Sequence, residues 1–341
     1  ALLITLIGSV GTEAILKLMD TPKAVFPHAV TYLRVTAFGS IASLLYSGLF
    51  SIMRSFGDSK TPVFIMIFSC VCNVALDLVM VLCFQMGVAG GALATGAAQL
   101  LAVVGSFWHA YRSIPWFRIR AGVGTPDREL MVKTLQLGLP IAGQNALIAL
   151  SCNVLQRVVN GFGETLVTAN TAVSKIEQLV QQPFTSLSSA LTAFTGQNVG
   201  ARKYDRVLKG FRTGCLFIVA VSAAMLVVMQ LFGRQILGLF VSDESVIGIC
   251  ARALQITSWF YAFLGLIYVV RGTLNGAGDT VYSALNGIVE LCCRIGFAYP
   301  LTRAPQIGMW GCFLCSGLTW MVTGILSLWR YLVGKWEKTY T

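Results

Sequence analysis

Charged residues are scarce in this sequence. Only 11% of its 341 residues are Asp, Glu, Lys or Arg, whereas 56% are hydrophobic. An ordinary soluble domain carries about 25% charged residues. So few charges cannot cover a surface that faces water, which argues against a soluble enzyme or binding module. The composition instead predicts a protein with many membrane-spanning helices that contacts the lipid bilayer.

Acidic residues and histidines are the rarest titratable groups. There are 14 Asp and Glu against 25 Lys and Arg, and two His, which gives a net charge of +11. The basic residues lie in short loops between apolar segments instead of gathering on one face, so we expect no nucleic-acid partner. No nucleotide-binding loop or metal cluster is present, and the ten Cys all lie in apolar segments. We therefore expect no cofactor.

Ten apolar runs of about 20 residues predict ten membrane spans, of which the first is incomplete. They cover 1–19, 30–53, 62–84, 88–111, 131–160, 165–195, 208–232, 246–270, 281–300 and 307–333. The longest connection is basic and contains Pro and Gly, which is typical of a linker. We predict an N-terminal lobe (1–112), a cytoplasmic linker (113–130) and a C-terminal lobe (131–341).

Two landmarks recur 221 residues later in the chain. The Gly-Asp pair at 57–58 returns at 278–279, and G-V-A-G at 87–90 is matched by G-M-W-G at 308–311. Equal spacing without a net insertion indicates an internal duplication. Six spans separate each landmark from its copy, so the halves are parallel repeats. We predict two pseudo-symmetric six-helix lobes, with about ten of twelve helices in this sequence and two before residue 1.

The basic loops set the predicted orientation. Under the positive-inside rule, the linker, both Gly-Asp loops and the C-terminus face the cytoplasm. The first loop is R-S-F-G-D-S-K-T-P at 54–62. We interpret these loops as turns and helix caps, with a cytoplasmic gate as the alternative. The residues concerned are Arg54, Gly57, Asp58, Gly278 and Asp279.

Several motifs carry a family resemblance. They are R-S-F-G-D-S-K-T-P at 54–62, N-V-A-L-D at 73–77, G-L-P-I-A at 138–142 and G-Q-N-V-G-A at 196–201. Together they resemble the multidrug and toxic compound extrusion (MATE) family, in particular its bacterial DinF-like group. The resemblance implies two six-helix lobes around a central cavity. It also implies a monomer in the bacterial inner membrane that exports organic cations in exchange for H⁺ or Na⁺.

Polar residues inside spans are costly and are treated as functional candidates. Asn73 and Asp77 are four residues apart and share one helical face. Asp77 would hold a proton near neutral pH in a low-dielectric lobe, or would bind Na⁺ with the Asn73 oxygen and the Thr95 hydroxyl. The resemblance places a cation-coupling site on these three residues, together with an aspartate on a helix before residue 1. The alternative is that Asp77 only hydrogen-bonds a neighbouring helix.

The C-terminal lobe has its own polar set, which we interpret as a substrate cavity. Its members are Gln144, Asn145, Glu177, Gln178 and Gln181. Pro183 follows them in the same span as Glu177 and predicts a hinge, since proline frees a backbone carbonyl. The alternative is a Lys175–Glu177 pair that satisfies itself between helices.

Three charged residues receive structural interpretations. Glu290 and Arg294 are four apart and predict a self-neutralising buried pair, whereas Arg271 is expected to extend towards the cytoplasmic end of its span. An acidic residue that the sodium-coupled NorM-like subgroup carries is missing from span 131–160.

The sequence therefore favours a secondary active drug antiporter. One alternative is a lipid-linked precursor flippase, which would need an arginine-lined cavity, and the cavity candidates here are mostly neutral or acidic. The other is an intramembrane enzyme, but His28 and His109 lie near span ends, far from any nucleophile or metal set.

Overall fold

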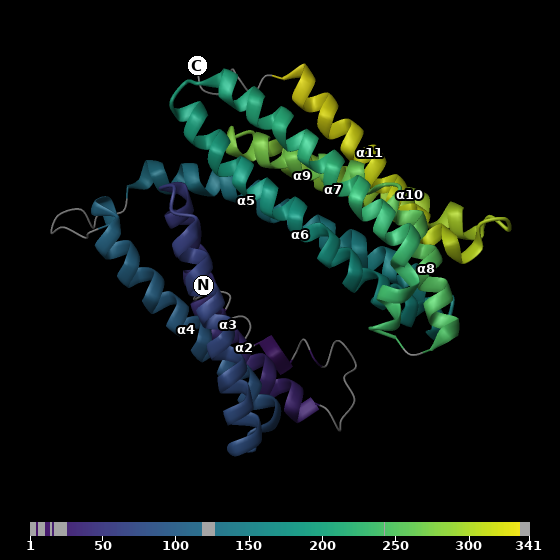
Figure 1. Ribbon diagram of the computed structural model, residues 1–341, viewed down its shortest axis with the longest axis horizontal. Helices are drawn as coiled ribbons and strands as arrows, with labels where there is room; N and C mark the ends of the chain where they lie inside the picture. The colour runs from purple at the N-terminus through teal and green to yellow at the C-terminus, as the bar shows by residue number, and fades with distance from the viewer. Residues whose placement is uncertain are drawn as a thin grey trace. The chain divides into compact units, whose positions relative to one another are not determined.

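The computed structural model describes residues 5, 11–13, 16, 26–117, 127–241 and 243–334, and these residues form helices joined by short turns (Figure 1). The expected first span, 1–19, falls largely outside these residues. The chain divides into two compact units, Ala1–Thr125 and Pro126–Thr341. The boundary falls in the segment 113–130 that the sequence marks as a linker, of which 118–126 lies outside the described residues.

Between residues 26 and 117, the first unit has three long helices that correspond to three expected spans. Helix α4 packs against both α2 and α3. Gly39 of α2 lies close to Gly96 of α4: a Cβ at Gly39 would stand 3.8 Å from the Gly96 Cα. The elements are α2 (Phe26–Ser55), α3 (Lys60–Leu78), the π-helix η1 (Val79–Cys83), α4 (Gly87–Ser113) and the short 3₁₀ helix η2 (Pro115–Phe117).

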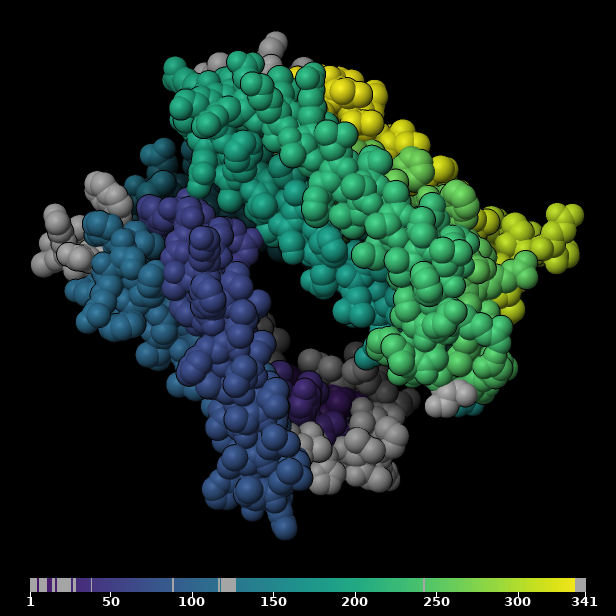
Figure 2. All heavy atoms as spheres, viewed as in Figure 1, coloured from purple at the N-terminus to yellow at the C-terminus, as the bar shows by residue number. Residues whose placement is uncertain are grey.

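The second unit packs α6 against α7 and α9, and α10 against α5 and α11. In the space-filling view its helices, teal to yellow, form one continuous packed body (Figure 2). Its elements are α5 (Arg128–Asn160), α6 (Glu164–Gly200), α7 (Tyr204–Gly238), α8 (Glu244–Ser258), α9 (Tyr261–Gly276), α10 (Val281–Arg303), the 3₁₀ helix η3 (Gly308–Trp310) and α11 (Gly311–Val333).

Two glycines let α9 approach α6 closely. A Cβ at Gly272 would stand 2.5 Å from the Ser188 carbonyl oxygen, and one at Gly276 would stand 2.5 Å from the Thr192 carbonyl oxygen. This G-x-x-x-G spacing puts both glycines on one helical face, where the absence of side chains lets two backbones come together. The Thr192 hydroxyl then donates to the Gly272 carbonyl across the contact (3.1 Å).

The described helices confirm the prediction of an all-α polytopic membrane protein. Seven of them are long and apolar enough to cross a membrane, and the bent pair α8 and α9 makes an eighth. Large apolar side chains stay exposed on the surfaces of these helices, for example Phe64, Phe68 and Leu82. Exposure on this scale is typical of helices that face lipid, because a soluble surface rarely carries such contiguous apolar area.

The predicted single span 246–270 was wrong in one respect, because the helix is broken. Helices α8 and α9 meet at an angle of 54°. The side chain of Gln230 on α7 donates to the Gln255 carbonyl (3.0 Å) and to the Ser258 hydroxyl (3.1 Å). These bonds satisfy polar groups next to the break, which is how a bend in a membrane helix is accommodated.

The repeat is visible in the backbone of both units. Gly57 and Gly278 have φ of +90° and +77°, and Gly87 and Gly308 have φ of +55° and +54°. Each pair is separated by 221 residues, and these left-handed conformations favour glycine. The landmark glycines are therefore the residues that let both halves turn in the same way.

Candidate functional site

The N-terminal unit brings together the three residues of the predicted cation site. Asn73 and Asp77 lie on α3 and Thr95 lies on α4. The Asn73 amide nitrogen is 3.4 Å from the Thr95 hydroxyl, which itself donates to the Gly91 carbonyl (3.0 Å). A Cβ placed on Gly91 would stand 3.7 Å from Asp77 Oδ1. The three side chains thus lie close to Gly91, where α4 has no side chain and its backbone is the nearest part of the helix.

The helix changes form directly after Asp77. α3 ends at Leu78, and Val79–Cys83 continues as a π-helix. Single π turns inside helices are frequent at functional sites, because the widened turn breaks the regular hydrogen-bond ladder. Asp77 has no hydrogen-bond partner among the described residues and is half-buried. Its carboxylate oxygens are thus free of protein donors in the described part of the chain.

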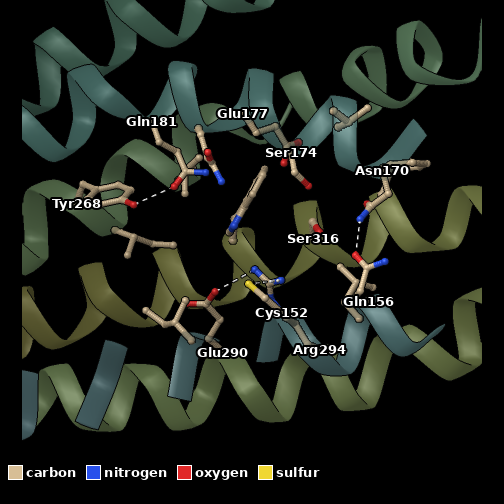
Figure 3. A pocket seen from close by; sticks show the side chains of 18 of the residues that line it. Cys152, Gln156, Asn170, Ser174, Glu177, Gln181, Tyr268, Glu290, Arg294 and Ser316 are labelled. Atoms are coloured by element: carbon tan, nitrogen blue, oxygen red, sulfur yellow. Dashed lines mark hydrogen bonds and ion pairs between the residues drawn. The ribbon is translucent and has the colours of Figure 1, made fainter. Parts of the chain in front are cut away.

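A second polar site lies wholly within the C-terminal unit. It is a cavity of 360 Å³ between α5, α6, α9, α10 and α11. Figure 3 shows Ser174, Glu177 and Gln181 of α6 pointing into it from one side, and Glu290 and Arg294 of α10 from the other. Tyr268, Phe313 and Trp320 supply aromatic wall. A few polar groups set in an aromatic lining are typical of small-molecule sites.

Hydrogen bonds fix part of this lining. The Tyr268 hydroxyl donates to Gln181 Oε1 (3.0 Å). Arg294 Nη2 donates to Glu290 Oε1 (3.1 Å), and Nη1 of the same guanidinium is 3.4 Å from Cys152 Sγ. Both members of the Arg294–Glu290 pair are buried, with side chains 7% exposed. The predicted self-neutralising pair is therefore present.

Two other charged groups of the cavity have no ion-pair partner in the described chain. Glu177 Oε1 is buried and forms no hydrogen bond, with the Thr257 hydroxyl and the Arg294 charge as its polar neighbours. The Arg271 guanidinium lies 5.3 Å from the centroid of the Tyr268 ring, and its Nε is buried without a partner. The cavity thus holds the Glu177 carboxyl and the Arg271 guanidinium, which do not form an ion pair with each other.

Arg271 corrects an expectation from the sequence. It does not extend to the end of its span, because its side chain lines the cavity. The cavity is mostly neutral, as expected, but its charged residues include two cations as well, since Arg271 and Arg294 balance Glu177 and Glu290. Each guanidinium is held inside the bundle by aromatic or acidic neighbours that the linear sequence does not reveal.

The remaining candidates occupy different places. Gln178 and Gln181 line the cavity with Glu177. Gln144 and Asn145 do not: Gln144 is buried, its backbone lying against Gly287 of α10, and Asn145 is exposed. Lys175 is exposed and forms no ion pair with Glu177 among the described residues. Pro183 lies inside α6, which runs through it as one helix, so the hinge remains a prediction.

Comparison with known proteins decides the family. The MatE family model matches residues 1–79 and 140–300, more than half of the chain. The chain belongs to the MatE family. MatE proteins are transporters and not enzymes, which removes the intramembrane-enzyme alternative.

Two relatives of this MatE chain are proteins of Bacillus subtilis. It is 27% identical to the probable multidrug resistance protein YoeA of Bacillus subtilis, over 98% of this chain and 74% of the relative. It is 26% identical to the probable multidrug resistance protein YpnP of the same organism, over 96% and 73%. A crystal structure of MATE in the bent conformation superposes with a TM-score of 0.90 at 22% identity, over 99% of this chain and 76% of that one.

The role of each polar site in this MatE protein stays a prediction. The described residues contain no group of three or more His, Cys, Asp and Glu side chains that could hold a metal ion. The Asn73, Asp77 and Thr95 cluster offers one carboxylate and two neutral oxygens, which fit Na⁺ as a transported ion or a proton on Asp77.

Sequence reasoning missed the place of Arg271 in the cavity, although the repeat held a signal. The residue 221 positions earlier is Phe50, so one half has an aromatic side chain where the other has a guanidinium. A charge that replaces an apolar residue within a membrane repeat indicates a buried polar site, because a cation facing lipid is costly.

Proposed function

We propose that this MatE protein is a secondary active transporter that exports organic cations and other drugs in exchange for H⁺ or Na⁺. The family membership and the relatives, both named as probable multidrug resistance proteins, support the substrate class. The charge distribution supports a place in the bacterial inner membrane, with the Gly-Asp turns and the C-terminus on the cytoplasmic side. We expect the transporter to act as a monomer.

The convergence of Asn73, Asp77 and Thr95 next to the π-helix is the observation that carries the coupling proposal. A carboxylate inside a membrane bundle gains most from binding a cation, because its charge is otherwise poorly solvated. A proton would neutralise Asp77 directly. Sodium would be held by the Asp77 carboxylate with the Asn73 and Thr95 oxygens. Either ion would change the interaction between α3 and α4, which the hydrogen bond from Asn73 to Thr95 now links.

Coupling to drug release follows from that change. Alternating access needs two states whose equilibrium the ion shifts, and an ion shifts it only if it binds one state better. In our proposal the cation binds the state that releases drug to the outside. The two helices that carry the ion site are therefore the elements that differ between the states.

The C-terminal cavity is the proposed place for part of the substrate. Its aromatic wall suits a flat hydrophobic drug, and Glu177 offers an uncommitted carboxyl to a cationic group. Gln178 and Gln181 add amide groups that can donate or accept. A pocket of 360 Å³ is at the small end of ligand sites, so it would enclose a drug-sized molecule only in part.

Ethidium efflux from cells that express the full-length protein tests the coupling site. We compare wild type with Asp77→Asn and with Glu129→Gln, a control that removes an exposed carboxylate at the start of α5. Asp77→Asn should abolish gradient-driven efflux at unchanged membrane levels, and Glu129→Gln should not. Efflux that survives in Asp77→Asn would refute the coupling role of Asp77.

One observation supports a second function. Arg271 and Arg294 line the cavity, and guanidinium groups are suited to bind phosphates. A flippase for lipid-linked precursors would use them to bind a pyrophosphate. Translocation of such a lipid by the protein in proteoliposomes, lost in Arg271→Met, would favour this function, and absence of translocation by wild type would exclude it.

A further inference from the structure

Both Gly-Asp turns are closed by the same two backbone hydrogen bonds. The Gly N–H donates to the carbonyl three residues before it, and the Asp N–H donates to the carbonyl five residues before it. All four donor–acceptor distances lie between 2.9 and 3.1 Å. The turns at Asp58 and Asp279 are therefore copies in hydrogen bonding as well as in sequence.

Each turn is also tied to the last part of another helix by its carboxylate. Asp58 Oδ2 lies 2.9 Å from His109 Nε2 on α4, and Asp279 Oδ2 lies 2.7 Å from Arg330 Nη2 on α11. His109 and Arg330 are themselves 221 residues apart. The carboxylate-to-base contact is thus a third element of the repeat, and only the chemical nature of the base differs.

That difference makes one contact depend on pH and the other not. An arginine stays protonated at every physiological pH, whereas histidine ordinarily gains or loses its charge between about pH 5 and 8. We propose that Asp58 and His109 form a proton-dependent latch that holds the α2–α3 turn against α4, and that Asp279 and Arg330 form its permanent counterpart. With the ring protonated the contact is an ion pair. With the ring neutral, at most a weaker hydrogen bond remains.

The groups around the latch leave His109 as the switch. Asp58 also accepts a hydrogen bond from the Thr61 N–H (3.1 Å). Partial burial acts to raise the pKa of Asp58, but the bonds from Thr61 and the His109 ring outweigh it and lower this pKa. The carboxylate therefore stays ionised throughout the range in which a histidine titrates.

Other charges nearby are engaged elsewhere or point to solvent. The Arg54 guanidinium at the end of α2 lies over the Phe50 ring, and that of Arg112 on α4 lies over Trp108. Lys60 at the start of α3 is exposed. On α4, the Ser113 hydroxyl is 3.5 Å from His109 Nδ1. Among the described residues, Asp58 is the only acidic partner of His109 in an ion pair.

The latch would make one end of the N-terminal unit respond to protons independently of the ion site at Asp77. At low pH the turn is held on α4, and at high pH it is freer to move. The matching turn of the C-terminal unit stays held at both. A fall in the proton concentration on the side that these turns face would thus loosen one repeat and not the other.

Hydrogen–deuterium exchange of the full-length protein in lipid nanodiscs tests this proposal. The rate of amide exchange is measured at pH 5.5 and 8.5 in both turns. The ratio of the rate in segment 53–61 to the rate in segment 274–282 is then compared between the two pH values. The second turn cancels the intrinsic pH dependence, because its amides make the same bonds. Protection of the first turn relative to the second should fall by about two- to fivefold at the higher pH, the range expected for a partly exposed ion pair.

The chain offers matched variants for the same measurement. His109→Arg copies the base of the second turn and should remove the pH dependence of the ratio, while Arg330→His should transfer pH dependence to the second turn. His28→Gln, which removes the only other histidine, should change nothing. A ratio that does not vary with pH in wild type, or that varies equally in His109→Arg, would overturn the proposal.

Discussion

Glu290→Gln tests the electrostatics of the C-terminal cavity most directly. The change keeps the shape of the side chain but removes the charge that faces Arg294. Both side chains are 7% exposed, so water can replace the lost partner only in part. Arg294 would keep its contact with Cys152 Sγ, which is only a weak acceptor.

The expected cost follows from that burial. Removing one member of a buried ion pair typically destabilises a protein by about 3–5 kcal/mol, because the other charge is left uncompensated. Two features place this case at or below the lower end of that range. The amide oxygen of Gln can still accept from Arg294, and Glu177 is a second acidic neighbour of that guanidinium. We expect a loss of about 2–3 kcal/mol, or a fall in Tm of about 4–8 °C.

The measurement is thermal unfolding of the solubilised protein, followed by the loss of the monodisperse peak in size-exclusion chromatography. The chain contains its own control in Arg234 and Glu244, an ion pair whose side chains are 65% and 70% exposed. Glu244→Gln should lower Tm by no more than about 2 °C, since exposed pairs contribute about 1 kcal/mol or less. Equal shifts in Glu290→Gln and Glu244→Gln would refute the reasoning.

Two further predictions follow from packing and from pH. Gly276→Leu should reduce the amount of folded protein by at least tenfold in fluorescence-detected chromatography, because a Cβ at that position would stand 2.5 Å from the Thr192 carbonyl oxygen. Gly238→Leu is the control, because a Cβ at Gly238 would have no atom within 4 Å. A similar loss in both variants would contradict the packing argument. The pKa of Asp58 is lower in the folded protein than the value of about 3.9 for Asp in an unfolded chain. The ionised carboxylate therefore stabilises the fold fully above the unfolded pKa, and this contribution is lost as the pH falls through the lower, folded pKa. Exchange in segment 53–61 should therefore accelerate between pH 5 and 3, after correction for the intrinsic pH dependence of amide exchange in an unstructured peptide. Asp58→Asn should abolish that step, and a step of the same size in the variant would count against it.

The two units keep the same turns but differ inside the membrane. The residues 221 positions after Asn73, Asp77 and Thr95 are Arg294, Ala298 and Ser316. Arg294 and Ser316 line the cavity of the second unit, while Ala298 is fully buried. The same positions of the repeat therefore carry a polar cluster with one carboxylate in one half, and a guanidinium and a hydroxyl that line a cavity in the other. Duplication conserved the backbone, and the side chains diverged.

Local features of the sequence were sufficient for the architecture. Long apolar runs predict helices wherever they occur, because a backbone in lipid must satisfy its own hydrogen bonds. The paired glycines predict turns, because a left-handed φ is unfavourable for other residues. The i, i+4 spacing of Glu290 and Arg294 predicts their contact, because one helix alone brings them together. Each of these inferences depends on residues within a few positions of each other.

Contacts between different helices could not be predicted from such local features of the sequence. Arg271 lies near the end of an apolar run, and only the packing of α9 against α6 turns it into the cavity. His109 meets Asp58 across 51 positions, and the break between α8 and α9 is stabilised by Gln230 from α7. These outcomes depend on which face of each helix meets its neighbour. Many arrangements bury similar apolar area, so the sequence determined the helices and turns, and the tertiary structure alone decided which polar groups meet.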